Sequence, residues 1–141
     1  MKIELGKRKM KILFLCTGNA YRSPLAEALL KKLRPDLKVD SAGLLVAIPI
    51  SMQIRAYLKE HAASDFLKPY PESIDEKEFN DYDVIVAMEP KHKSAVLKRC
   101  PNCEKRVIVW NIEDPYLESD KDVQRIFAEI EKRVKILAES L

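Results

Sequence analysis

The chain has 141 residues, of which 47% are hydrophobic and 33% charged, a balance that favours one folded domain and excludes an intrinsically disordered chain. Its 25 Lys and Arg against 22 Asp and Glu give a formal net charge of +3, too small a surplus to indicate a nucleic-acid-binding protein. No apolar run approaches the roughly 20 residues of a membrane-spanning helix, and the N-terminus lacks the pattern of a signal peptide.

Strand-like and helix-like segments alternate along the chain. The apolar run 11–15 predicts a buried strand, and residues 23–33 follow it with helical spacing, with Ser23 as the expected cap. Further strands are expected at 37–41, 83–88 and 106–110, and further helices at 53–61 after Ser51, at 91–99, and from Ser119 with Asp122 to Leu137. This alternation predicts an α/β fold, a parallel sheet with helices on both faces. We expect one domain over residues 1–141, with 1–9 as an N-terminal extension.

The chemistry concentrates in the loop from Cys16 to Ser23, between the first strand and the first helix. Open α/β sheets bind ligands at this edge, and a helix N-terminus offers free N–H groups and a positive dipole to phosphate. Gly18 and Asn19 tolerate the left-handed backbone that a tight anion-binding loop requires. We expect the backbone N–H groups of residues 17–22 to bind phosphate together with the forked guanidinium of Arg22.

Cys16 begins this loop and is the candidate nucleophile. The same N–H groups, helix dipole and arginine favour its thiolate, which would attack phosphorus and form a phosphocysteine. Ser23 would hydrogen-bond the sulfur and help it leave in a second step. A lone cysteine at a strand end is usually a core residue, so the prediction depends on the whole Cys-x5-Arg-Ser pattern in a strand–loop–helix context.

The loop from Leu15 to Pro24 resembles the signature of the low-molecular-weight protein tyrosine phosphatases and their arsenate-reductase relatives. Residues 41–43 (Ser-Ala-Gly) and 114–116 (Asp-Pro-Tyr) also match, in the family's order, and the resemblance runs from about Met10 onward. It implies a three-layer fold with a four-stranded parallel sheet and the phosphate-binding loop after the first strand. It also implies phosphorylated protein substrates, foremost phosphotyrosine, with phosphate as product and inhibitor. No metal, cofactor, membrane or nucleic acid is expected.

The resemblance also suggests roles outside the loop. Asp114 becomes the general acid and then the base, although an Asp-Pro pair by itself most often marks a turn; Glu113 is a weaker contender. Ser41 pairs with Asn19 to support the loop. The residues expected to bind substrate are Thr17, Gly18, Asn19, Ala20, Tyr21, Ser23 and Tyr116, the last forming a pocket wall.

The sequence departs from the family pattern at three places, and the last two leave the substrate open. Tyr21 stands where the family usually carries a second cysteine, so a protective disulfide with Cys16 is not expected. Ala20 is smaller than the aliphatic residue of tyrosine phosphatases, and a relative that dephosphorylates arginine has a polar residue there. Residues 44–50 lack the Trp or Tyr that often lines the mouth. Protein arginine phosphatase is therefore an alternative, and a non-catalytic phosphate-binding module is disfavoured by the presence of both Cys16 and Asp114.

Cys100 and Cys103 form a C-x-x-C pair that is compatible with a redox pair, half of a zinc site or two ordinary cysteines. Zinc takes four ligands, and a zinc site here would need both histidines of the chain, His61 and His92, so a structural zinc site is not expected. Arsenate reductases of this fold have relay cysteines directly after the third strand, where this chain has Met88 and Glu89, so the distance to Cys16 discriminates that alternative. Three cysteines in all are too few for a disulfide scaffold and predict a cytoplasmic protein.

Overall fold

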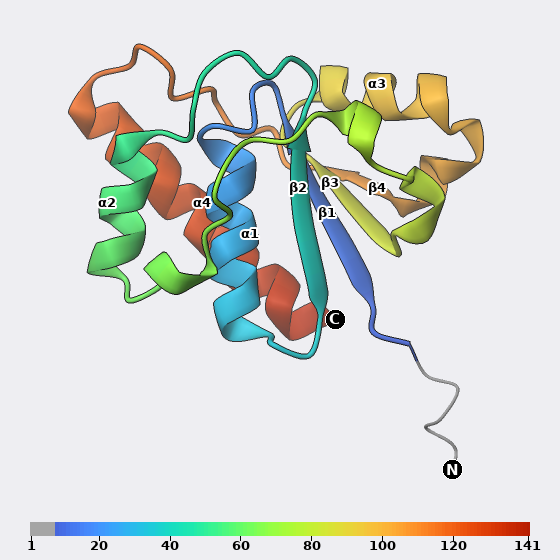
Figure 1. Ribbon diagram of the computed structural model, residues 1–141, viewed down its shortest axis with the longest axis horizontal. Coiled ribbons are helices and arrows are strands. Elements are labelled where there is room, and N and C mark those ends of the chain that lie inside the picture. Colours follow the sequence, from blue (N-terminus) through green and yellow to red (C-terminus); the bar gives the residue numbers. More distant parts are fainter. Residues whose placement is uncertain (1–7) are drawn as a thin grey trace.

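The computed structural model describes residues 8–141, so most of the expected extension 1–9 lies outside the described residues. The sheet has four parallel strands in the order β2-β1-β3-β4 (Figure 1). The expected α/β class and parallel sheet are confirmed. The strands are β1 (Lys11–Cys16), β2 (Lys38–Gly43), β3 (Val84–Ala87) and β4 (Val107–Val109); the α-helices are α1 (Arg22–Leu33), α2 (Met52–Glu60), α3 (Pro90–Arg99) and α4 (Asp120–Ser140).

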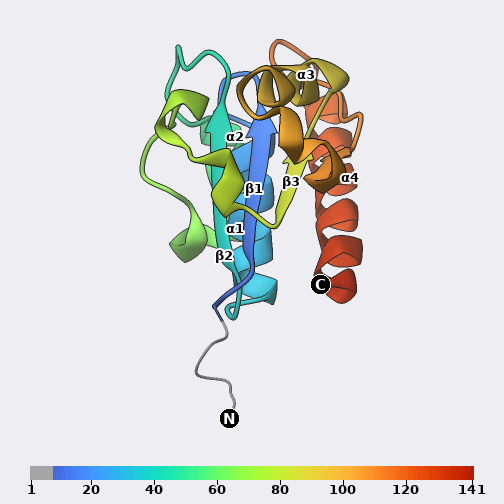
Figure 2. The same ribbon diagram turned by 90° about the vertical axis from the view of Figure 1, so that its right-hand side faces the viewer.

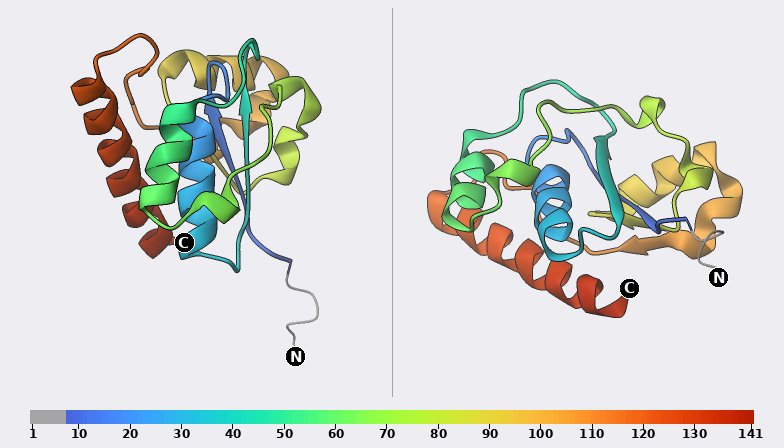
Figure 3. Two further views of the ribbon diagram at one scale, coloured as in Figure 1. Left: turned by 60° about the vertical axis from the view of Figure 1, so that its left-hand side comes forward. Right: turned by 60° about the horizontal axis from the view of Figure 1, so that its bottom comes forward.

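Helices cover both faces of the sheet. Helices α1, α2 and α4 lie on one face and α3 on the other, as two turned views show (Figure 2, Figure 3). Alternate residues of β1 therefore enter different cores: Ile12 and Phe14 pack with α1 and α4, whereas Leu13 and Leu15 pack with α3. Because both faces are buried, β1 is apolar from Ile12 to its end at Cys16.

The helix boundaries follow local capping chemistry. Ser51 accepts a hydrogen bond from the Gln53 N–H at the start of α2, and Ser119 accepts one from the Asp122 N–H at the start of α4. Both caps are confirmed. No helix within residues 8–141 is long and apolar enough to cross a bilayer.

The expected cap of α1 is wrong. The helix begins at Arg22 after Tyr21, which makes no side-chain cap, and Ser23 lies inside the first turn. The Ser23 hydroxyl instead contacts Asn19 and Cys16. The side chain of Ser23, which the sequence predicted to cap the helix, therefore forms hydrogen bonds within the loop that follows β1.

The loop after β1 lies at the point where the strand order reverses. Strands β2 and β3 flank β1 on opposite sides, so the chain crosses from β1 to β2 in one direction and from β2 past β1 to β3 in the other. Open sheets of this kind have a crevice at the carboxyl ends of the strands at that point. The fold therefore places Cys16 at the ligand-binding edge of the sheet.

Candidate active site

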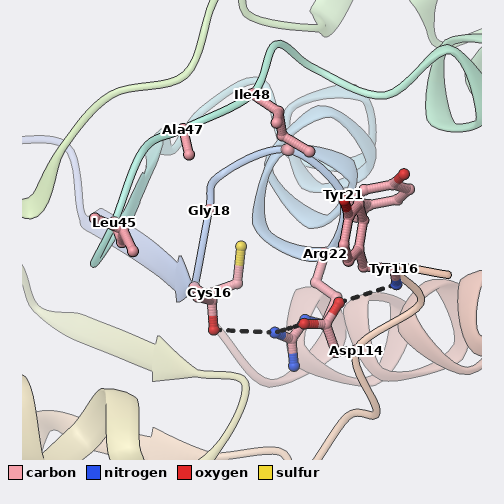
Figure 4. A pocket seen from close by; sticks show the side chains of 11 residues that line it. Cys16, Gly18, Tyr21, Arg22, Leu45, Ala47, Ile48, Asp114 and Tyr116 are labelled. Atoms are coloured by element: carbon pink, nitrogen blue, oxygen red, sulfur yellow. Dashed lines mark hydrogen bonds and ion pairs between the residues drawn. The ribbon is translucent and has the colours of Figure 1, made fainter.

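A pocket of about 240 Å³ opens at this edge of the sheet, over the loop that follows β1 (Figure 4). Its floor is the loop, and two further segments form its walls. One wall comes from the segment after β2 and the other from the segment after β4. The lining residues include Cys16, Arg22, Leu45, Ile48, Asp114 and Tyr116.

Cys16 lies at the bottom of the pocket and is only 2% exposed. Its Sγ is 2.9 Å from Ser23 Oγ and accepts a hydrogen bond from the Asn19 N–H at 3.3 Å. It is the one free cysteine of the chain. Donors that point at the sulfur favour its anionic form.

The left-handed turn of the loop is made at Asn19, which has φ 54°. Gly18, the other residue suited to this conformation, does not adopt a positive φ. The Asn19 side chain donates from Nδ2 to Ser23 Oγ at 2.7 Å and to Ser41 Oγ at 2.9 Å. The expected pair of Asn19 and Ser41 is therefore in direct contact beneath the loop.

Gly43, at the end of β2, lets the loop pack closely against the sheet. A Cβ at this position would lie 2.7 Å from both Asn19 N and Gly18 C, and 2.9 Å from Thr17 O. These are backbone atoms, so the loop itself would have to move. Close approach, rather than an unusual φ, explains a glycine here.

We expect Gly43→Ala to displace the loop and to lower the free energy of unfolding by about 1–3 kcal/mol. Gly18→Ala is the matched variant, because its Cβ would meet no atom closer than 3.8 Å. Denaturant unfolding measures stability, and titration with inorganic phosphate measures the loop, whose affinity should fall at least tenfold in Gly43→Ala. Equal unfolding free energies for the two variants would contradict the close packing.

Arg22 is buried at the floor of the pocket, and protein groups bind one of its two terminal nitrogens. Its Nη1 donates to Glu89 Oε2 at 2.6 Å and to Ile112 O at 2.8 Å. Burial alone would raise the pKa of Glu89, but the hydrogen bond and charge of Arg22 outweigh it and hold that pKa below its ordinary value. Nη2 lies toward the pocket, 3.6 Å from Asp114 Oδ2. One edge of the guanidinium is thus fixed by protein and the other faces the cavity.

His92 supports the loop from α3. It is fully buried, and its Nδ1 accepts from the Glu89 N–H at 3.0 Å, which leaves the proton on Nε2 to be donated to Thr17 Oγ1 at 3.0 Å. Burial and the nearby charge of Arg22 lower the pKa of His92 to about 4. The ring is therefore neutral near pH 7 and acts as a fixed donor to Thr17.

Asp114 reaches the pocket from the loop after β4. Its Oδ1 accepts from the Tyr116 N–H at 3.0 Å, a local turn that orients the carboxylate, and its side chain is 48% exposed. Glu113 points elsewhere, into an ion pair with Arg125 at 2.8 Å. Of the two acidic candidates, only Asp114 lines the pocket.

Aromatic and aliphatic side chains form the pocket walls. The ring of Tyr116 meets that of Tyr21 edge to face, with centroids 6.4 Å apart. Leu45, Ala47 and Ile48 line the opposite side (Figure 4). Tyr116, expected at a wall, lies in that position, and the wall opposite it is aliphatic.

Sequence reasoning missed Glu89, His92 and Lys68 among the residues around the loop. Glu89 and His92 form a capping box at the start of α3, so their spacing marks a helix start in the sequence but not their contact with the loop. Lys68 lies in an irregular segment and carries no such signal.

Cys100 and Cys103 form a disulfide at the far end of α3. Both pack in the core with Leu13 and Leu15, on the face of the sheet opposite the core that contains Cys16. The pair also directly precedes β4, so it lies at the edge of the sheet away from the pocket. This placement gives no support to a redox relay with Cys16.

Comparison with known proteins agrees with this geometry. The family model described as low molecular weight phosphotyrosine protein phosphatase matches residues 11–141. The chain is 31% identical to the low molecular weight protein-tyrosine-phosphatase Wzb of Escherichia coli K12, over 92% of this chain and 94% of that protein. It is 30% identical to Etp of the same organism, over 86% and 87%.

Solved structures give the same result. Wzb of Vibrio vulnificus, in complex with benzylphosphonate, aligns with a TM-score of 0.83 at 26% identity, covering 95% of this chain and 100% of that one. The YwlE arginine phosphatase of Geobacillus stearothermophilus aligns with a TM-score of 0.81 at 26% identity, covering 93% and 92%. Structural similarity by itself therefore does not separate tyrosine from arginine as the phosphorylated residue, whereas both sequence relatives above are named protein-tyrosine-phosphatases.

Proposed function

Because this chain belongs to the low molecular weight phosphotyrosine protein phosphatase family, whose members are cysteine-dependent phosphatases, we propose that it hydrolyses phosphotyrosine in proteins with Cys16, Arg22 and Asp114. The observation that supports these roles is their meeting in one pocket from three distant segments. Arg22 links the other two groups, because it lies on the loop that begins with Cys16 and 3.6 Å from Asp114. A bound phosphoryl group would contact all three.

In the first step the Cys16 thiolate attacks phosphorus and the bond from phosphorus to the tyrosyl oxygen breaks. Asp114 donates a proton to the departing phenolate, so that neutral tyrosine leaves. The loop N–H groups and Arg22 hold the equatorial oxygens, where charge is concentrated in the transition state. The product is a phosphocysteine.

In the second step water attacks the phosphocysteine and the sulfur–phosphorus bond breaks. Asp114, now a carboxylate, accepts the proton of the water. The hydroxyl of Ser23, 2.9 Å from Sγ, stabilises the thiolate as it leaves. Inorganic phosphate is released, and the same loop contacts make it a competitive inhibitor.

We expect Asp114→Asn to lower kcat on an aryl phosphate about 10²- to 10³-fold, the usual contribution of a general acid. The loss should depend on the leaving group, because an acidic phenol needs no proton in order to depart. A series of aryl phosphates with phenols of graded acidity measures this, with Glu113→Gln as the control variant, since Glu113 pairs with Arg125 outside the pocket. A loss of the same size for every leaving group would contradict the acid role.

The apolar and aromatic side chains that line the pocket favour phosphotyrosine over phosphoarginine as the substrate. The rings of Tyr21 and Tyr116 and the aliphatic Leu45 and Ile48 offer a phenyl ring apolar contact on several sides. A phosphoguanidinium would need polar partners for its N–H groups, and among the lining side chains Asp114 is the one carboxylate.

Peptides of one sequence that carry phosphotyrosine, phosphoserine or phosphoarginine at the same position test this preference. We expect kcat/KM to be highest for phosphotyrosine by at least about tenfold, the value of one well-packed aromatic contact. Ala20→Thr should narrow the gap to phosphoarginine, because it restores a polar side chain on the loop. A higher kcat/KM of the unmodified protein for phosphoarginine would overturn the assignment. We further propose that the enzyme works in the cytoplasm, where reducing conditions keep Cys16 a free thiol; the Cys100–Cys103 disulfide is buried in the core and so is shielded from the same reductants.

A further inference from the structure

We propose that Lys68 is a positioning residue that acts through the Asn19 side-chain amide to aim the Ser23 hydroxyl at the Cys16 sulfur; this inference rests on the proposed role of Cys16. Lys68 belongs to the irregular segment between α2 and β3 and touches neither the pocket nor the expected substrate. Its side chain is nevertheless 6% exposed. A buried ammonium is costly unless it is fully paired, so its partners indicate what it does.

The ammonium group of Lys68 lies directly below the loop. It donates to Asn19 Oδ1 at 3.0 Å, to Ser41 O at 2.8 Å and to Ser41 Oγ at 3.1 Å, and it pairs with Glu72 Oε1 at 2.7 Å. An ammonium has three N–H groups, so these four acceptors leave none of them unpaired. The contact with Asn19 therefore belongs to a filled coordination set and not to a loose surface contact.

This contact decides which way the Asn19 amide faces. Oδ1 also accepts from the Glu72 N–H at 2.8 Å. An ammonium and a backbone N–H can only donate, so the oxygen must face these two groups. The NH2 end must then face Ser23 and Ser41, which is the arrangement in the structure. All four hydrogen-bonding positions of the amide are filled.

The orientation of the amide in turn fixes the polarity of Ser23. Its Oγ accepts from Asn19 Nδ2 at 2.7 Å, so its proton is free for Cys16 Sγ at 2.9 Å. If the amide turned over, Oδ1 would face Ser23 and take that proton away from the sulfur. Lys68 supplies one of the two donors that prevent this rotation.

The second N–H of the Asn19 amide orients the Ser41 hydroxyl in the same way. Ser41 Oγ accepts a hydrogen bond from Asn19 Nδ2 and donates its own hydrogen bond to Glu27 Oε1. Glu27 is buried and paired with Lys31 at 2.6 Å. The branch ends on a carboxylate, an obligatory acceptor, which again requires the amide to present its NH2 end.

The alternative role of Lys68 is to neutralise buried acids. Its ammonium lies 3.8 Å from Glu27 and 4.0 Å from Asp40, besides Glu72. Lys77 makes the same kind of contribution, because its Nζ pairs with Asp40 at 2.6 Å and Glu72 at 3.1 Å and its side chain is 8% exposed. No hydrogen bond links Lys77 to the phosphate loop within residues 8–141.

Lys68→Met and Lys77→Met therefore form a matched pair. Both remove a buried ammonium from the acids Asp40 and Glu72, but only Lys68→Met removes a donor from the Asn19 amide and so weakens the restraint on its orientation. We expect both variants to lose stability, and Lys68→Met alone to lose about tenfold in kcat on an aryl phosphate, a typical value for a hydrogen bond to a charged group. Equal kcat values for the two variants would overturn the proposal.

A double-mutant cycle with Ser23→Ala tests the route through the hydroxyl. If Lys68 acts by aiming Ser23, Lys68→Met should change kcat less than about twofold in the Ser23→Ala background. Losses that multiply in the double variant would show that Lys68 acts by another path.

Alkylation of Cys16 by iodoacetamide at neutral pH separates this proposal from the proposed phosphatase activity, because it reports the reactivity of the sulfur without any turnover of phosphate. The charged groups that face the site are Arg22, Glu89 and Asp114 beside the pocket, and Glu27, Asp40 and Glu72 around Lys68. These groups are present in both lysine variants. We expect the rate of alkylation to fall about tenfold in Lys68→Met and to stay unchanged in Lys77→Met. That result would support Lys68 even if aryl phosphates were not hydrolysed, whereas equal alkylation rates in active variants would refute it.

Discussion

Cys16→Ser is expected to reduce the hydrolysis of an aryl phosphate by about 10⁴-fold or more, the scale at which loss of a nucleophile acts. A serine hydroxyl in the same place is a far weaker nucleophile than a thiolate at neutral pH. The serine hydroxyl also remains protonated, because an alcohol is a far weaker acid than a thiol and the donors around this position cannot make up the difference. Steady-state rates at mildly acidic pH measure the loss.

The same variant should keep its affinity for inorganic phosphate. Arg22 and the backbone N–H groups of the loop are unchanged, and Asn19 still holds the loop from below through Ser41. Phosphate titration by calorimetry is the control that separates loss of chemistry from loss of the site. Substantial turnover by Cys16→Ser with intact phosphate binding would mean that another group attacks phosphorus.

Arg22→Lys is expected to lower kcat/KM on an aryl phosphate by about 10³-fold, in the range found when a preorganised transition-state donor is removed. Lysine keeps the charge but cannot donate to Glu89 and Ile112 with one edge and to two phosphate oxygens with the other. The loss should fall on kcat as well as on KM, because the fork fits the transition state better than the ground state.

Arg34→Lys is a matched control at the opposite end of α1. Arg34 is less buried than Arg22 but likewise forms an ion pair, with Asp36 at 2.8 Å, and it is not among the residues that line the pocket. We expect its kinetic constants to equal those of the unmodified protein. A loss at Arg22→Lys no greater than at Arg34→Lys would remove Arg22 from the reaction.

Much of the fold follows from local sequence patterns. The sequences of β1 and α4 each indicate their own structure. A strand that is buried on both faces is a continuous apolar run, whereas a helix that is buried on one face has apolar residues at every third or fourth position. The Cys-x5-Arg-Ser loop is likewise continuous in sequence. Its position at the carboxyl edge of the sheet then follows from the alternation of strands and helices.

Residues that act on the loop from other segments were beyond sequence reasoning. Lys68 lies in a segment with no periodicity, and only the folded chain brings its ammonium to Asn19. Glu89 and His92 follow β3 and reach the loop because β3 pairs with β1. The cap assigned to Ser23 failed for a related reason: the loop used its hydroxyl, and this tertiary demand overrode the local preference for capping.

The most direct test of the account is to trap the covalent intermediate. The protein is mixed with an aryl phosphate, quenched in denaturant during the first turnover, digested and examined by mass spectrometry. We predict one phosphoryl group on the peptide that contains Cys16, and none after the same treatment of Cys16→Ser. Rapid turnover with Cys16 unmodified, or with the phosphoryl group on another residue such as His92, would contradict the proposed mechanism.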